Sequence, residues 1–238
     1  MVSKTQMRER VRAFDWSGVA AALEESPALA GVRDDRGRNW LHLCCGTEPK
    51  DQAAVAASVR TAETLLGAGF DIDEPAFTEG AWRATPLWYA ISRGRNLTLA
   101  RWLLERGCDP EHCLWAAQFA RDPDAIRLLV GFGARLDVSQ DGETPFLMAV
   151  KWSHFDEAWL LADLGADVDA KDDQGLTALH LMLKKASEAA ELRRLVERGA
   201  RGDIPGPDGR TAVDLLRRKR GPEFRAIADA LEQRARPP

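Results

Sequence analysis

The residues with the clearest capacity for acid–base chemistry are two histidines, His42 and His180, each the fourth residue of a short segment: Asn-Trp-Leu-His and Thr-Ala-Leu-His. An imidazole titrates near neutral pH, so either side chain could act as a general base. Similar segments elsewhere carry other residue types in this place: Trp88, Trp115, Leu147 and Asp214. A position that accepts such different side chains within one chain is not committed to catalysis. We therefore expect each imidazole to make local hydrogen bonds that order a loop.

Cysteine could bind a metal, and Cys108, His112 and Cys113 lie close together in the sequence, with Cys44 and Cys45 as further candidates. A structural zinc site needs four converging ligands, and this spacing matches none of the usual paired-ligand patterns. We expect Cys108 to pack as a small apolar side chain, and we expect no metal or cofactor. Four cysteines, two of them adjacent, are not typical of a disulfide framework, which favours a reducing, cytoplasmic location.

Other reactive patterns lack the partners that their chemistry requires. The glycines of residues 131–134 follow no predicted strand and precede no Lys-Ser or Lys-Thr, so they do not match a phosphate-binding loop. The sequence contains neither Gly-x-Ser-x-Gly nor His-Glu-x-x-His. Acidic pairs recur at regular intervals and suit solvated turns: Asp34-Asp35, Asp141 with Glu143, and Asp172-Asp173. We find no catalytic group of residues and predict that the protein is not an enzyme.

Composition narrows the class of protein further. The chain has 238 residues, is 45% hydrophobic and 29% charged, and carries a formal charge of −4. This composition is typical of a soluble folded chain and argues against a dedicated nucleic-acid binder, which is usually basic. No apolar run approaches the length of a membrane span, and the first ten residues do not resemble a secretory signal. The alanine and arginine content suggests a GC-rich, bacterial source.

The elements that carry these residues repeat along the chain. One motif has two apolar residues and then a glycine, and it occurs as LLGAGFDID (65–73), LLERGCDP (103–110), LVGFGARLD (129–137), LADLGADVD (161–169) and LVERGARGD (195–203). A second motif alternates with it, as NWLHLCC (39–45), TPLWYAI (85–91), HCLWAAQ (112–118), TPFLMAV (144–150), TALHLML (177–183) and TAVDLLR (211–217). The central apolar residues of the last four copies are 32, 33 and 34 residues apart. Two interleaved motifs with one period predict a repeat architecture.

The second motif resembles the signature of the ankyrin repeat family. Residues 172–180, DDQGLTALH, are close to the family's Asp-x-x-Gly-x-Thr-Pro-Leu-His, and residues 34–42 and 139–147 follow the same frame with substitutions. The resemblance covers nearly the whole chain and implies an all-α solenoid of stacked helix–turn–helix units joined by β-hairpin-like loops. It also implies that a partner protein binds the concave side, through the loop tips and the exposed ends of the inner helices.

Elementary helix chemistry supports the same frame. A threonine before a helix, as at the start of four copies of the second motif, can cap its free amides, and Pro or a small residue suits the first helical turn. The glycines Gly69, Gly107, Gly133, Gly165 and Gly199 stand where a second helix should end, a position that favours left-handed backbone. Each helix pair must bury its apolar face on its neighbours. We predict one domain over 1–238: an N-terminal cap (1–33), repeats at 34–73, 74–107, 108–137, 138–169 and 170–203, and a C-terminal cap (204–234).

Two repeats depart from the period. The first contains about nine extra residues within 46–55, which predicts an extended loop and a lengthened outer helix. The link from Gly107 to Leu114 is only seven residues long, too short for a hairpin-like loop, whereas the loop before Leu87 is long. Residues 4–13 and 16–25 are predicted as helices of the N-terminal cap, and 211–219 and 223–234 as helices of the C-terminal cap.

The residues that the frame leaves exposed are the candidate partner-binding residues. They are Arg36, Arg38, Trp82, Arg93, Phe119, Gln140, Asp141, Lys151, Trp152, Gln174, Lys184, Lys185 and Arg218. Exposed tryptophans can anchor an interface, although packing is an equal alternative for Trp82 and Trp152. Five other tryptophans are expected to pack in the core: Trp16, Trp88, Trp102, Trp115 and Trp159. Basic residues near helix ends would favour an acidic partner, although cations there also interact with the helix dipole.

The function predicted from these features is a non-enzymatic protein–protein interaction module, in one version an inhibitor or immunity-type protein of a single partner. A secreted bacterial effector and an auxiliary subunit of an enzyme remain alternatives, with residues 46–58 as the segment most unlike a repeat. Nucleic-acid binding through the basic stripe is a further alternative, which the negative net charge disfavours.

Overall fold

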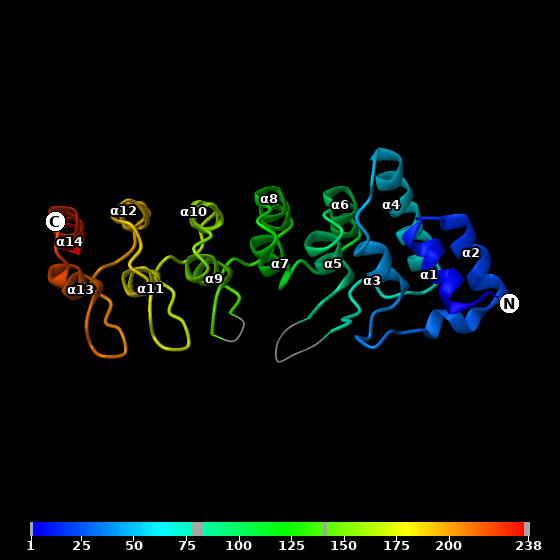
Figure 1. Cartoon of the computed structure of the whole chain (residues 1–238), viewed down its shortest axis with the longest axis horizontal. Helices are drawn as coiled ribbons and strands as arrows, with labels where there is room; N and C mark the ends of the chain where they lie inside the picture. The colour runs from blue at the N-terminus through cyan, green and yellow to red at the C-terminus, as the bar shows by residue number, and fades with distance from the viewer. Residues whose placement is uncertain (1, 78–82, 140–141, 236–238) are drawn as a thin grey trace. The chain divides into compact units, whose positions relative to one another are not determined.

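The computed structural model describes residues 2–77, 83–139 and 142–235. Within them it contains fourteen α-helices, one short 3₁₀ helix (Pro27–Gly31), and β-structure limited to two isolated bridges (Figure 1). The chain divides into two compact units, Met1–Ala134 and Arg135–Pro238. The all-α repeat architecture expected from the sequence is confirmed. In the described part of the chain, no helix is both long and apolar enough to cross a membrane.

The N-terminal unit contains four helix pairs. They are α1 (Lys4–Arg12) with α2 (Trp16–Glu25), α3 (Trp40–Cys45) with α4 (Gln52–Gly67), α5 (Pro86–Ser92) with α6 (Leu97–Glu105), and α7 (Cys113–Phe119) with α8 (Pro123–Gly131). Helix α3 packs against α1 and α5, and α5 packs against α7, which forms an inner layer. Helices α2, α4, α6 and α8 pack against one another in order as an outer layer.

The C-terminal unit contains three pairs. They are α9 (Pro145–Lys151) with α10 (Phe155–Asp163), α11 (Ala178–Lys184) with α12 (Ala189–Glu197), and α13 (Ala212–Arg218) with α14 (Pro222–Ala235). The inner helices α9, α11 and α13 pack in sequence, as do the outer helices α10, α12 and α14. Both units therefore bury apolar residues between successive pairs, as a repeat protein must.

The inner helices begin at polar residues that cap them. The hydroxyls of Thr85, Thr144 and Thr211 each accept a hydrogen bond from the backbone amide three residues later, at 3.2–3.3 Å. Asn39 caps α3 in the same way. Thr177 differs, because its hydroxyl lies 2.8 Å from His180 Nδ1 and makes no side-chain cap. The predicted threonine caps are thus confirmed at three helices and not at α11.

The outer helices end at the predicted glycines, which have positive φ angles between 84° and 104°: Gly69, Gly107, Gly133, Gly165 and Gly199. This left-handed backbone is available to glycine without the steric penalty that a Cβ brings. The glycine spacing therefore identified the helix ends correctly.

The two irregular repeats are also as predicted. Helix α4 has 16 residues, whereas α6, α8, α10 and α12 each have nine. Residues 108–112 form only a turn before α7. Asp73 holds this short link, because its Oδ1 accepts from the Asp109 amide and from Cys108 Sγ, both at 3.0 Å.

The tryptophan prediction holds only in part. Trp115 and Trp159 are buried, but Trp16 is 42% exposed, and Trp88 and Trp102 are half-buried. Trp16 stands at the start of α2, where its ring lies under the guanidinium group of Arg60 at 5.9 Å and leaves one side to solvent. Trp102 is covered similarly by Arg106 at 3.6 Å. At these two tryptophans, contact with an arginine side chain and its guanidinium group takes the place of burial in the core.

Candidate functional site

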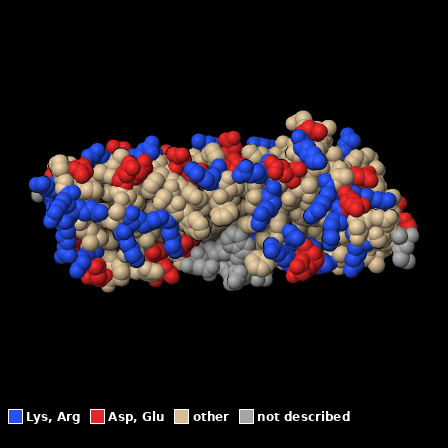
Figure 2. Space-filling view, viewed as in Figure 1, with Lys and Arg blue, Asp and Glu red and all other residues tan. Residues whose placement is uncertain are grey.

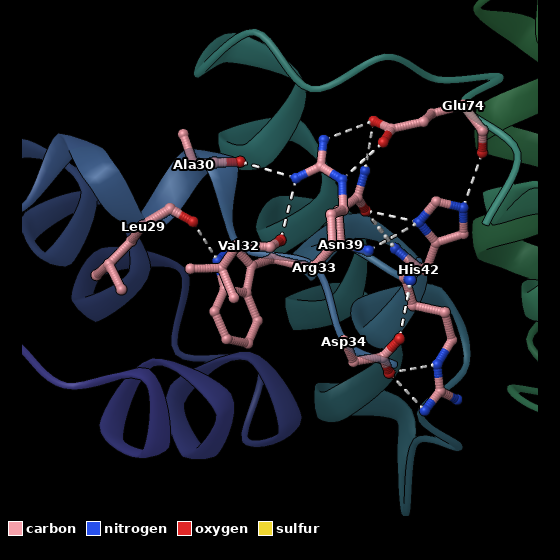
Figure 3. Close-up of polar contacts among 10 residues, drawn as sticks. Leu29, Ala30, Val32, Arg33, Asp34, Asn39, His42 and Glu74 are labelled. Carbon is pink, nitrogen blue, oxygen red and sulfur yellow. Dashed lines mark hydrogen bonds and ion pairs between the residues drawn. The ribbon is translucent and has the colours of Figure 1, made fainter. Parts of the chain in front are cut away.

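A polar network around Glu74 joins the first loop, residues 32–39 before α3, to the second loop, which connects α4 to α5 (Figure 3). The Glu74 carboxylate accepts hydrogen bonds from Arg33 Nε (2.7 Å), Arg33 Nη2 (3.1 Å) and Asn39 Nδ2 (2.8 Å). His42 Nε2 donates to the Glu74 backbone carbonyl at 2.8 Å. The Asn39 backbone amide lies 3.3 Å from His42 Nδ1 and donates to it. Both ring nitrogens of His42 are therefore occupied by the protein itself.

Burial determines the protonation state of His42. It lowers the pKa of the imidazole from 6.5 to about 4, against the opposing effect of the hydrogen bond to Glu74 and with a further contribution from the charges of Arg33 and Arg38. His180 makes equivalent contacts, with Nε2 lying 3.1 Å from the Arg210 carbonyl oxygen. The expectation that both histidines order loops is confirmed.

The cysteines are buried and free: Cys44, Cys45, Cys108 and Cys113. Burial raises the pKa of each thiol, to about 12 for Cys113. A protonated buried thiol is a poor nucleophile and a poor metal ligand. Among the described residues, no group of three or more histidine, cysteine or acidic side chains could hold a metal ion.

A groove of about 830 Å³ opens on the N-terminal unit, where the first two loops meet α3 and α5. Its basic lining comes from three separate segments: Arg12 at the end of α1, Arg36 and Arg38 in the first loop, and Arg93 after α5. Its aromatic lining consists of Phe77, Trp88 and Tyr89. The structure thus brings three of the predicted partner-binding residues, Arg36, Arg38 and Arg93, to one hollow.

The loop carboxylate Asp34 neutralises one of these arginines. Arg38 Nη2 lies 2.7 Å from Asp34 Oδ2, and the Arg38 guanidinium also lies 5.8 Å from the centre of the Tyr89 ring. Burial tends to raise the pKa of Asp34, but hydrogen bonds from the Arg38 backbone and side chain and from the Arg36 amide outweigh it and lower the pKa. Asp34 consequently stays ionised, and it holds Arg38 in place.

The other three arginines of the groove are exposed, and in the part of the chain that the structure describes none of them forms an ion pair with a carboxylate: Arg12, Arg36 and Arg93. Guanidinium groups bind carboxylate and phosphate oxygens through paired hydrogen bonds. The half-buried Trp88 ring packs edge to face on the buried Tyr89 ring, with ring centres 5.1 Å apart, and Trp88 and the 41% exposed Phe77 give the groove its apolar surface. The groove is therefore suited to an anionic ligand that also carries an apolar group.

In the C-terminal unit, two predicted lysines have structural roles. Lys151 pairs with Glu143, and Lys185 Nζ donates to the Lys151 carbonyl oxygen and to Ser153 Oγ, the latter at 3.1 Å. Lys185 thereby closes the C-terminal end of the neighbouring helix α9, where backbone carbonyls lack helical partners. The Lys185 amine is therefore used in hydrogen bonds to the neighbouring repeat. The sequence of α11 gave no indication of these bonds.

The other predicted residues of this unit are exposed. Trp152, the residue after α9, is 57% exposed and its ring centre lies 6.4 Å from that of His154. Lys184 and Arg218 are exposed at the ends of α11 and α13, and Gln174 is exposed in the loop before α11. Figure 2 shows lysine and arginine side chains gathered over α11 and α13 as well as over α1 and α3. Exposure fits an interface role for these residues but does not assign one.

Of the four remaining predicted residues, one lies away from the groove and three lie outside the residues that the structure describes. Phe119 is 63% exposed at the end of α7 and does not line the groove. Trp82, Gln140 and Asp141 lie outside the described residues.

Sequence reasoning did not identify four lining residues of the groove: Arg12, Phe77, Trp88 and Tyr89. Trp88 and Tyr89 follow Leu87 in the second motif, where other copies have Leu-Met or His-Leu. This unusual aromatic pair could have indicated a binding site from the sequence. Arg12 gave no such signal, because it lies outside the repeats and reaches the groove only through the packing of α1 on α3.

Helix pairs that pack against their neighbours in order, with adjacent loops joined by the hydrogen bonds of His42 and His180, define a helical repeat protein. Two family models match the chain: ankyrin repeats in three copies over residues 113–205, and a single ankyrin repeat over residues 82–113. The chain belongs to the ankyrin repeat family. The fold is similar to the crystal structure of the ankyrin repeat domain of Bcl-3, described as a unique member of the IkappaB protein family (TM-score 0.73, 21% identity, covering 98% of this chain and 100% of that one).

A second similar structure is the human ASB11 ankyrin repeat domain, with a TM-score of 0.67, 20% identity and full coverage of both chains. At these identities the likeness establishes the fold. The comparison with curated proteins gave no match. Proteins of this fold generally act as protein–protein interaction modules.

Proposed function

We propose that this protein is a non-enzymatic module that binds a specific partner protein through the groove of its N-terminal unit, as an inhibitor or immunity-type protein would. One observation supports this most strongly. Arg12, Arg36 and Arg93, which have no ion-pair partner within the described chain, converge with Trp88 and Tyr89 on one hollow. Arginine and aromatic residues are the types most often responsible for binding energy at protein interfaces.

The partner surface is proposed to be acidic where it meets the groove. Complementary charge accelerates the encounter, and a desolvated aromatic contact slows dissociation. The four cysteines are all free and buried, which is consistent with a cytoplasmic location.

The experiment is affinity capture from the native source with two variants of equal charge change. Arg36→Glu with Arg93→Glu reverses charge in the groove, whereas Arg101→Glu with Arg127→Glu reverses charge on the outer helices α6 and α8, where these exposed residues line a different hollow. We expect the groove variant to lose a protein that the wild type and the outer-helix variant both retain. Equal retention by both variants, with unchanged melting temperatures, would contradict the proposal.

A further inference from the structure

Helix α1 carries a basic stripe directed at the first loop. Lys4, Arg8 and Arg12 are four residues apart, so they lie on one face of the helix. All three are exposed, and all three line a hollow of about 290 Å³ together with first-loop residues that include Asp34 and Asp35. Met7 and Val11, which are fully buried, fix α1 in this orientation.

This hollow is continuous with the groove. Arg12, Arg38 and Leu43 line both, so the basic surface extends from Arg93 after α5 to Lys4 at the start of α1. Figure 2 shows the corresponding concentration of basic side chains over α1 and α3.

The combined surface is strongly unbalanced in charge. Of the residues that the structure describes, seven basic side chains line it and two acidic ones, Asp34 and Asp35. Two of the basic residues are paired inside the fold, Arg33 with Glu74 and Arg38 with Asp34. Among the residues that the structure describes, the remaining five form no ion pair: Lys4, Arg8, Arg12, Arg36 and Arg93. Neighbouring like charges repel one another, and a ligand with several negative charges relieves that repulsion.

We propose that the surface binds an extended acidic polypeptide segment, with an apolar side chain of the ligand against Trp88 and Tyr89 and its carboxylates along α1. This rests on the function proposed above and adds the class of ligand and the participation of α1. The stripe from Lys4 to Arg12 is about 12 Å long at the helical rise, which matches roughly four residues of extended chain.

Asp34 and Asp35 favour polypeptide over nucleic acid. A nucleic-acid strand would bring a phosphate past these carboxylates at every step, whereas a polypeptide can place an uncharged residue there. The rings at the far end of the surface are compatible with an apolar side chain, so one peptide can use both features.

The test is fluorescence anisotropy with a labelled peptide of one tryptophan followed by six glutamates. A shorter peptide with two glutamates, a six-glutamine peptide, and a single-stranded oligothymidine of equal charge serve as companion probes. The α1 variant is Lys4→Glu with Arg8→Glu. Glutamate is a good helix former, and at position 4 it also suits the first helical turn, so α1 should persist, which a thermal melt verifies.

We expect the wild type to prefer the six-glutamate peptide over all companion probes. The α1 variant should weaken that binding about tenfold, since two exposed ion pairs become repulsive contacts, and should leave the two-glutamate peptide unchanged. The salt dependence of binding should also become shallower. Arg101→Glu with Arg127→Glu should change none of these values.

Three other outcomes would each contradict one part of this proposal: the role of α1, the acidic ligand or the polypeptide class. If the α1 variant binds like the wild type while Arg36→Glu with Arg93→Glu weakens binding, α1 takes no part and the proposed function stands. If neither variant weakens binding of the peptide, the acidic-ligand inference fails, and the capture experiment decides the proposed function separately. Tighter binding of the oligothymidine than of the peptide would show that the ligand class is wrong.

Discussion

Acidification should destabilise the first repeat through His42. Its side chain has no exposed surface, and burial lowers its pKa to about 4 from the usual 6.5. Between these two pH values the unfolded chain binds a proton at His42 that the folded chain does not. The contribution of His42 to the free energy of unfolding is therefore complete above pH 6.5 and is lost as the pH falls through 4. At pH 5 the loss is about 2 kcal/mol, and below pH 4 it approaches about 3 kcal/mol.

The matched variant is His42→Gln, whose amide nitrogen can still donate to the Glu74 carbonyl but does not titrate. Urea unfolding at pH 7.5 and at pH 5 should show that the free-energy difference between wild type and variant shrinks by about 2 kcal/mol at the lower pH. All other titrating groups are common to both proteins and cancel in this comparison.

An NMR titration of the His42 ring reads the pKa directly and tests the cause. Asn39 Oδ1 lies 2.7 Å from His42 Nδ1 and would accept a hydrogen bond from that nitrogen when it is protonated, so this contact and burial have opposite effects on the pKa. A midpoint at pH 6 or above, or an unchanged difference between wild type and His42→Gln, would refute the conclusion that burial dominates.

Three further changes test the frame and its contacts. Gly165→Val should lower the free energy of unfolding by about 2 kcal/mol or more, because φ is +104° there. Gly131→Val, at an open helical position, should lower it by under about 1 kcal/mol. Equal urea midpoints for the two variants would mean that the repeat boundaries are shifted. Trp152→Ala should leave the melting temperature nearly unchanged because the ring is 57% exposed, and a sharp drop would show that it is a core residue. Glu74→Gln should destabilise by about 1 kcal/mol through loss of the Arg33 ion pair, and full stability in a thermal melt would show that the network contributes nothing.

The architecture was predictable from the sequence because its determinants are local. A capping threonine or asparagine, a short apolar helix and a glycine with left-handed backbone act within a few residues, and they recur at one period. Gly165 and His180 could therefore be assigned by their place in the repeat, and the structure confirms both assignments. The lengthened α4 and the shortened link after Gly107 followed from the same spacing.

The site depended on contacts between elements that the period does not encode. Arg12 and Trp88 line one groove only because α1 packs on α3 and α3 on α5. Lys185 had the sequence context of an exposed partner-binding residue, yet its amine closes the end of α9. The repeat fixes the backbone position of a side chain, whereas the neighbouring helix decides whether its charge faces solvent or a carbonyl. For this reason the sequence alone determined the fold and the class of protein, and only the tertiary structure decided which basic residues remain available to a partner.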